Sequence, residues 1–318
     1  MSGSQYISEQ NEKIYCSIDI GTNTVLMLIA KYDGINFYII DEKYDIARLG
    51  ETLDKTGFIS EAAFDRTINI LKNFIDIAES YNSEEFIIAA TSAMRDASNG
   101  DEIKNRMESF IGKKIDIISG EMEAKLSFEG TVENKKRNIV IDIGGGSTEV
   151  IYGKEDKIIL LKSFNIGAVR LTERFFSDQP PTLYDIEKTS DLIFKLIDKD
   201  INIDDFEDIY AVAGTATTIA KTALNLKDFD IEQIDGYVLK NKILSDVFYK
   251  YAVSDTNEII TKYGVHPKRA DLITAGALIL MMISQKLNKE DIIVSSKGLR
   301  YGLLKERIKK FDVKFIRS

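Results

Sequence analysis

The sequence predicts an α/β protein of two similar domains, each a mixed sheet covered by helices, which flank a cleft. The first observation behind this prediction is an internal repeat. Residues 15–24 and 139–149 are both apolar runs that carry an Asp and lead into a Gly-containing polar turn. The second is that strand and helix patterns alternate after each copy of the repeat. The third is size, because 318 residues with 44% hydrophobic content can supply two separate cores.

The first half of the chain is predicted to open with a three-stranded antiparallel meander. Its strands are expected at residues 14–20, 25–31 and 36–40, with a turn at Asp33-Gly34. A helix is expected between the N-cap residue Ser60 and Tyr81, since apolar residues recur there at helical spacing. The remaining elements are predicted in the order strand 86–90, helix 101–111, strand 115–118 and helix 121–133.

The second half is predicted to repeat the three-strand opening, and the domains are expected to span residues 1–125 and 126–318. Its predicted elements are strands within 139–152 and 158–164, a helix at 183–198, a strand with a glycine turn at 209–215, a helix from Thr217, a buried helix at 272–283 and a strand at 292–294. An amphipathic helix is expected from Gly302 onward, and its residues 303–318 are expected to pack on the first domain.

Composition excludes several classes of function. Lys and Arg total 42 against 51 Asp and Glu, and a net charge of −9 lacks the basic field of nucleic-acid binders. Residues 1–13 have no apolar core of a signal peptide, and the apolar stretch 272–283 is too short to span a bilayer, so no membrane partner is expected. The single cysteine, Cys16, cannot form an intramolecular disulfide, which fits a cytoplasmic location. The single histidine, His266, excludes a His-rich metal site.

The two Gly-containing turns are candidate phosphate loops. In the first turn, Gly21 allows close approach of the backbone, and Thr22, Asn23 and Thr24 supply side-chain donors. The second turn has three consecutive glycines, which lose backbone entropy that a plain turn need not lose. It consists of Gly144, Gly145, Gly146, Ser147 and Thr148. Each alone is also typical of an ordinary hairpin turn, and it is their pairing that favours a phosphate clamp.

Three carboxylates accompany these turns and indicate a divalent cation. Asp19, Asp142 and Glu149 would repel bound phosphates unless a hard cation lay between them. Mg²⁺, or Mn²⁺, fits this requirement, because Mg²⁺ takes one or two protein carboxylates together with phosphate oxygens. The alternative is that Asp142 and Glu149 cap the glycine turns.

Glu121 and Glu123 begin the helix that connects the two halves. Either could be a general base aimed at a water in the cleft, or simply a favourable charge in the first turn of a helix. Their spacing does not choose between these interpretations.

Basic residues at the ends of predicted strands and loops are candidate phosphate contacts. They are Arg48, Arg95, Arg170, Lys221, Arg269, Lys297 and Arg300. Most Lys and Arg side chains merely solvate a surface. Gly214 and Thr215 form a third glycine turn at the start of a helix, where an anion or a tightly packed turn would suit equally well.

Together these motifs resemble the exopolyphosphatase and guanosine pentaphosphate phosphohydrolase family, within the actin-like ATPase superfamily. The resemblance runs through segments 18–24, 48–51, 90–97, 118–124, 140–149, 166–173, 214–218, 269–271 and 298–302. It implies two ribonuclease-H-like domains around the cleft and hydrolysis of a terminal phosphoanhydride. The resemblance is to the short, two-domain branch of the family, which lacks the HD-type helical domain of longer members.

The resemblance also assigns roles to individual residues. Glu123 matches the family's catalytic glutamate, which positions and deprotonates the attacking water. Asp142 and Glu149 match metal-binding carboxylates, Arg95 matches an arginine near the reacting phosphate, and the two turns match phosphate loops. Three residues depart from the common pattern: Met122 stands where many members have Glu, Leu26 where many have Arg, and Ser296 where many have Asp.

The predicted function is therefore a Mg²⁺-dependent exopolyphosphatase that releases orthophosphate from inorganic polyphosphate, with guanosine pentaphosphate as an alternative or additional substrate. A homodimer is also expected. A non-catalytic sensor of guanosine tetra- or pentaphosphate is the alternative from another class. An ATP-using kinase or actin-like ATPase is a second enzymatic alternative, because the superfamily shares the two turns.

Overall fold

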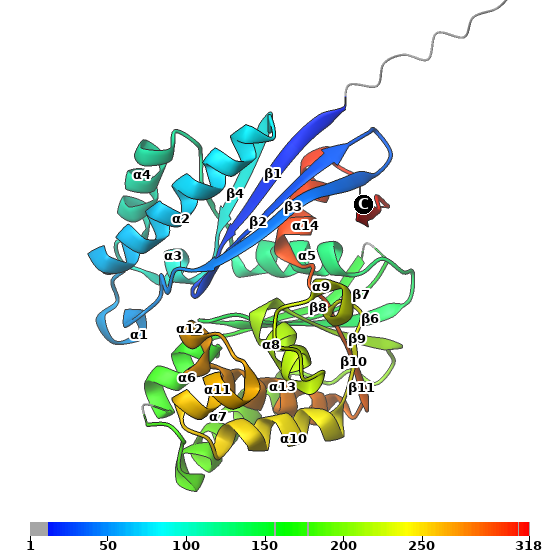
Figure 1. Cartoon of the computed structure of the whole chain (residues 1–318). Helices are drawn as coiled ribbons and strands as arrows, with labels where there is room; N and C mark the ends of the chain where they lie inside the picture. Colours follow the sequence, from blue (N-terminus) through cyan, green and yellow to red (C-terminus); the bar gives the residue numbers. More distant parts are fainter. Residues whose placement is uncertain (1–11, 156, 177, 311, 318) are drawn as a thin grey trace, which may run out of the picture.

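The computed structural model describes residues 12–155, 157–176, 178–310 and 312–317, so most of the polar N-terminal segment lies outside the described residues. Two six-stranded mixed sheets, each covered by helices, lie one above the other in Figure 1. Two helices lie between the sheets. In the described part of the chain, no helix is long and apolar enough to cross a membrane.

The first sheet has the strand order β12-β3-β2-β1-β4-β5. Its strands are β1 (Lys13–Ile20), β2 (Thr24–Tyr32), β3 (Phe37–Ile46), β4 (Glu85–Ala90), β5 (Asp116–Ile117) and β12 (Phe315–Arg317). The strands β1, β2 and β3 form the predicted antiparallel meander, and β4 is parallel to β1. The accompanying helices are α1 (Leu53–Thr56), α2 (Glu61–Ser80), α3 (Ser92–Asp96) and α4 (Gly100–Ile111).

The second sheet has the order β10-β11-β9-β6-β7-β8. Its strands are β6 (Arg137–Ile143), β7 (Thr148–Lys154), β8 (Lys157–Phe164), β9 (Asp208–Val212), β10 (Val238–Lys240) and β11 (Asp291–Val294). Read as β8-β7-β6-β9-β11, this order matches β3-β2-β1-β4-β5 of the first sheet, so the repeat predicted from the sequence is confirmed in the topology. The helices of this half are α6 (Ala168–Phe175), α7 (Leu183–Asp200), α8 (Ala213–Ala223), α9 (Ile231–Ile234), α10 (Asn241–Ala252), α11 (Thr256–Tyr263), α12 (Pro267–Ala270) and α13 (Ile273–Leu287).

Helix α2 shows how the sequence directs these elements. The Ser60 hydroxyl accepts a hydrogen bond from Ala63 N at 3.2 Å, which confirms the predicted N-cap. Phe64, Leu71 and Phe74 lie on one face and are almost fully buried in the first core, with Cys16 beside them. Burial of each large apolar side chain contributes about 1.5–3 kcal/mol, so this face fixes the helix on the sheet.

Helices α5 (Gly120–Thr131) and α14 (Leu299–Ile308) are the two connections between the sheets, and they cross in contact with each other. The contact depends on glycine. A Cβ on Gly130 would lie 2.1 Å from the carbonyl oxygen of Gly298, and one on Gly302 would lie 1.9 Å from that of Leu126. The backbones therefore approach more closely than any side chain would permit. The predicted domain boundary at residue 125 falls inside α5 and stays a prediction.

The expected helix over residues 303–318 is wrong in extent. Helix α14 ends at Ile308, where Lys309 adopts a left-handed conformation at the C-cap. The chain then returns to the first sheet as β12, which pairs with β3. The Phe315 ring stacks on that of Phe37, with 5.1 Å between the ring centroids, and packs edge-on against that of Tyr301, with 4.5 Å between the centroids. These aromatic contacts favour a strand at the sheet edge over further helix.

Candidate active site

The two Gly-containing turns have the same local geometry and lie against each other. Gly21 N donates to Thr24 O, and Gly144 N donates to Ser147 O, both at 3.0 Å. A Cβ on Gly145 would lie 2.9 Å from Thr22 Cβ, which places the first loop in contact with the second. Thr22, Gly145 and Gly146 line one cavity, so the two loops share a cleft, as the pairing of the motifs predicted.

Glycine is required where the second loop meets Ser92 and the segment before α6. A Cβ on Gly146 would lie 2.9 Å from Ser92 Oγ, and one on Gly167 would lie 2.4 Å from the carbonyl oxygen of Gly145. Ser92 was not singled out in the sequence, although its hydroxyl is 2.8 Å from that of Thr22. The second loop is therefore held between the first loop and the start of α6.

The carboxylates that accompany the two loops lie close enough to one another for their charges to interact. Asp19 is the penultimate residue of β1, as Asp142 is of β6, and Glu149 is the cross-strand partner of Asp142. Burial raises the pKa of all three groups, and the negative charge of Glu123 raises those of Asp19 and Glu149 further. These buried carboxylates lie near one another, and keeping them ionised costs free energy unless a cation is present.

Two serines that the sequence reasoning missed hold these carboxylates. Ser127 donates to Asp142 at 2.6 Å, and Ser163 donates to Glu149 at 2.7 Å. Ser127 follows Glu123 by four residues on α5, so helical spacing was the available signal. Ser147 of the second loop also hydrogen-bonds to Glu149, a contact in line with the turn-capping alternative.

These side chains fit a hard divalent cation. The atoms that they offer to a cation are carboxylate oxygens, and Asp19 Oδ1 is buried without a hydrogen-bond partner. No three His, Cys, Asp or Glu side chains form a ready-made metal cluster among the described residues. Mg²⁺ commonly takes only one or two protein carboxylates and completes its shell with phosphate and water, so two carboxylates such as Asp142 and Glu149 would be enough to hold it.

Glu123 and Glu121 occupy different environments, which the sequence did not distinguish. Ser119 caps α5, and the turn that follows directs Glu123 toward the buried carboxylates while Glu121 is exposed. Arg95 donates to Glu123 at 3.1 Å and to the Ile118 carbonyl at 2.9 Å. Burial raises the pKa of Glu123 to about 7, an effect that the Arg95 charge opposes. Such a group can exchange a proton near neutral pH.

Arg269 lies beside both the first loop and α8. Its guanidinium donates to Thr24 Oγ1 at 3.3 Å and to Thr218 Oγ1 at 3.4 Å. Gly214 and Thr215 lie at the start of a helix, as expected, but the separate turn before Thr217 is wrong, because α8 begins directly at Ala213, whose φ is +67°. Gly214 instead gives space to Arg269, since a Cβ there would lie 2.0 Å from Nη1.

The other predicted basic contacts have protein partners. Arg170 donates to the Gly146 carbonyl at 2.8 Å and also pairs with Asp54 and Asp96. Arg48 pairs with Asp271 at 2.6 Å, across the two halves. Lys221 donates to the Gly264 carbonyl, and Lys297 pairs with Glu133. Their roles as phosphate contacts stay predictions.

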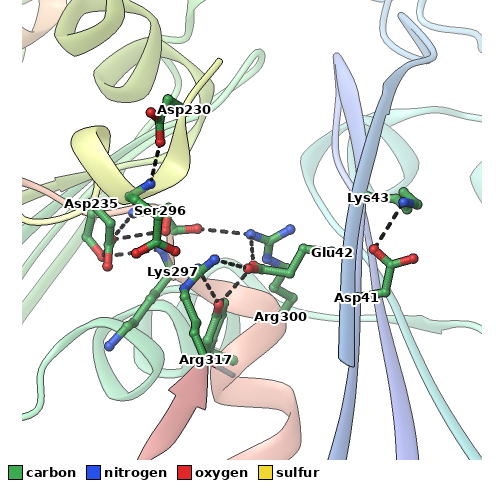
Figure 2. Close-up of polar contacts among 12 residues, drawn as sticks. Asp41, Glu42, Lys43, Asp230, Asp235, Ser296, Lys297, Arg300 and Arg317 are labelled. Atoms are coloured by element: carbon green, nitrogen blue, oxygen red, sulfur yellow. Dashed lines mark hydrogen bonds and ion pairs between the residues drawn. The ribbon is translucent and has the colours of Figure 1, made fainter. Parts of the chain in front are cut away.

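Arg300 belongs to a polar network shown in Figure 2, and its positive charge opposes the rise in the pKa of Asp19. It pairs with Glu42 at 2.7 Å, and Arg317 of β12 pairs with the same carboxylate at 2.7 Å. Ser296, one of the departures from the family pattern, donates to Asp235 through its backbone N at 2.7 Å and its hydroxyl at 3.0 Å. This network ties β3 to the segment before β10.

Comparison with known proteins decides the family. A model of the Ppx/GppA phosphatase family matches residues 28–311. The chain belongs to this family. The resemblance inferred from the motifs is therefore confirmed, and so is the expectation of a phosphoanhydride-hydrolase type of enzyme.

Relatives of the chain carry three kinds of name. The chain is 28% identical over 289 residues to exopolyphosphatase 2 of Mycobacterium tuberculosis, covering 86% of this chain and 90% of the relative. It is 30% identical to a guanosine-5'-triphosphate,3'-diphosphate pyrophosphatase of Pseudoalteromonas translucida, covering 92% of this chain and 59% of the relative. It is 34% identical to a bifunctional 3-dehydroquinate synthase/phosphatase of Fusobacterium nucleatum, and it spans 47% of that protein's length while 94% of this chain is covered.

Solved structures confirm the fold. The Ppx/GppA family member of Aquifex aeolicus superposes with a TM-score of 0.79 at 30% identity, over 94% of this chain and 98% of that one. An exopolyphosphatase from Cytophaga hutchinsonii superposes with a TM-score of 0.87 at 26% identity, over 93% and 98%. The predicted α/β architecture of two helix-covered mixed sheets is that of the family.

Proposed function

We propose that the protein is a Mg²⁺- or Mn²⁺-dependent exopolyphosphatase that releases terminal orthophosphate from inorganic polyphosphate. Guanosine pentaphosphate, through its 5′-phosphate, is an additional substrate in this proposal. The observation that supports it most is the position of Glu123, which faces the buried carboxylates below two phosphate-loop turns in contact with each other. Family membership and the names of the relatives support the reaction class.

In the proposed reaction, a water molecule attacks the terminal phosphorus and the bond to the bridging oxygen breaks. Glu123 accepts the proton of the water, and the bridging oxygen becomes the new terminal oxygen of the shortened chain. Backbone N–H groups of the two loops bind the phosphoryl oxygens. Arg95 lies next to Glu123, where its positive charge both lowers the pKa of the base and stabilises charge on the transferred group.

The carboxylates Asp142 and Glu149 would hold the cation, and Asp19 would face it. A bound Mg²⁺ supplies neutralisation of the phosphate charge during transfer. Ser127 and Ser163 fix the orientation of the two ligands through their hydroxyls. Removal of Mg²⁺ with EDTA should therefore abolish turnover, and added Mg²⁺ should restore it.

The test is release of orthophosphate from polyphosphate or guanosine pentaphosphate by the purified protein with Mg²⁺. We expect Glu123→Gln to reduce turnover by about 10²- to 10⁴-fold while polyphosphate binding is largely retained. Glu121→Gln is the matched control, because that exposed carboxylate lies in the same helical turn. Absence of phosphate release from both substrates would end the proposal.

The same assay separates the alternatives. Calorimetric binding of a guanosine polyphosphate without turnover would identify a sensor. Transfer of phosphate from ATP to an acceptor would identify a kinase. Of the residues that depart from the common family pattern, Met122 has an exposed side chain, and Ser296 contacts Asp235. Neither is placed among the carboxylates that the proposed reaction uses. The expected homodimer is part of the proposal and is tested by light scattering in solution.

A further inference from the structure

A buried cationic side chain lies beside the first loop. Arg269 is enclosed between Thr24 of the first loop and Thr218 of α8, and its Nε is buried without a hydrogen-bond partner. Among the residues that the structure describes, no Asp or Glu forms an ion pair with Arg269. A buried guanidinium of this kind requires an anion, and the phosphate loop beside it indicates which anion.

Two aromatic rings from opposite halves meet directly outside Arg269. The Tyr44 ring lies 5.6 Å from the Arg269 guanidinium carbon, and its centroid is 6.0 Å from that of Phe229. Tyr44 and Phe229 remain 43% and 42% exposed. Their contact therefore leaves ring surface open to a ligand.

On the side of α1 and α6, ion pairs join the two halves. Arg170 and Arg174 of α6 both bind Asp54 of α1, and Arg170 also binds Asp96. Three acidic residues, Asp54, Asp96 and Glu173, line the cavity shared by the two loops, together with Arg170. A phosphate chain held by the loops, with its reacting end at Glu123, would meet less repulsion on its way out past Arg269.

We propose that Tyr44 and Phe229 form a stacking subsite for the base of a nucleoside polyphosphate, whose phosphates extend past Arg269 into the two loops. This inference rests on the proposed function and adds a determinant of substrate choice. Polyphosphate has no aromatic part and gains nothing from exposed rings. A nucleobase stacks on aromatic side chains with an energy that is worth roughly a tenfold change in affinity or more.

The absence of tryptophan from the chain gives a direct test. The Tyr44→Trp variant carries a single tryptophan, and a stacked base should quench its fluorescence. The variant is prepared with Glu123→Gln so that ligands are not consumed, and it is titrated with GTP and, separately, with inorganic tripolyphosphate in Mg²⁺. We expect quenching by GTP and none by tripolyphosphate. Tyr249→Trp is the control, because that exposed ring lies on α10.

The second measurement compares affinities by calorimetry. Phe229→Ala should weaken GTP binding at least fivefold relative to tripolyphosphate binding. An equal loss for both ligands would show that the aromatic pair is only a contact between the halves, and would overturn the subsite. Absence of GTP quenching would overturn it as well. If the wild-type protein still hydrolyses polyphosphate in either case, the proposed function stands without the subsite.

Discussion

At the scale of single residues, the protonation of Glu123 gives the first prediction. Only the deprotonated carboxylate can accept a proton, and burial raises its pKa to about 7. We therefore expect kcat/KM for polyphosphate to rise with pH up to about 7 and then to level off. The Arg95 charge lowers this pKa, so Arg95→Gln should move the rise to higher pH.

A pH profile recorded for wild type, Arg95→Gln and Glu121→Gln checks this prediction. Glu121→Gln should keep the wild-type midpoint, because that carboxylate is exposed and apart from the cluster. An Arg95→Gln midpoint at or below the wild-type value would contradict the assigned electrostatics.

Ser127 gives a second prediction at this scale. Its hydroxyl holds Asp142 at 2.6 Å, and loss of a group that orients a metal ligand commonly costs 10- to 100-fold in metal affinity. The Ser127→Ala variant should therefore need about tenfold more Mg²⁺ for half-maximal turnover, with a smaller change in rate at saturating Mg²⁺. Thr131 is one turn further along α5 and donates to the Ser127 carbonyl, so Thr131→Ala is the control. The same Mg²⁺ requirement in Ser127→Ala and wild type would refute the role.

At the scale of elements, the crossing of α5 and α14 predicts a large effect from one methyl group. In Gly302→Ala the Cβ would lie 1.9 Å from the Leu126 carbonyl oxygen, which is backbone and cannot rotate away. We expect destabilisation by about 1–3 kcal/mol or more, seen as a lower melting temperature in calorimetry. Gly112→Ala meets no atom within 4 Å, so it bears only the cost of its left-handed backbone. Equal melting temperatures for the two variants would contradict the close packing.

The sequence predicted well the strands with which each half of the chain begins, because buried strands are continuous apolar runs that end at an Asp and a glycine. It did not lead us to α10, although Leu244, Val247 and Phe248 carry the helical period. The end of the chain was misjudged for a different reason. Residues 315–317 become a strand through pairing with β3, a partner more than 270 positions away.

Contacts between positions that are distant in the sequence also limited the prediction of the site. The residues of the two loops were found because they repeat, and Glu123 was found by resemblance. The pairing of Arg170 with Asp54 joins positions 116 apart, and the Tyr44 contact with Phe229 joins different halves. Such contacts depend on how the two sheets are placed, which no local pattern specifies.

At the scale of the whole molecule, the ion pairs around Asp54 predict an equilibrium between closed and open clefts. Asp54 binds two arginines of the other half at 2.5–2.7 Å, and the Arg174 hydrogen bond is the main reason that its pKa is lowered. Charged hydrogen bonds of this type contribute about 1.5–3 kcal/mol. The Asp54→Asn variant should therefore populate an open form and show a larger radius of gyration in X-ray scattering.

Asp76→Asn is the control for this measurement, since Asp76 lies on the exposed side of α2. Polyphosphate should return Asp54→Asn to the compact form, because phosphates held by both loops replace the lost contact. Identical scattering of Asp54→Asn and wild type without ligand would show that these ion pairs do not hold the cleft closed.

The chain passes between the sheets at two places only in its described part, and both passages, α5 and α14, meet at Gly130 and Gly302. Two helices packed backbone to backbone in this way resist sliding past each other but still permit the two halves to rotate about their contact. Groups far from it, such as Arg170 on one rim and Tyr44 on the other, would then travel much farther than the helices themselves. A small rotation of α5 against α14 would thereby produce a large change in the width of the cleft.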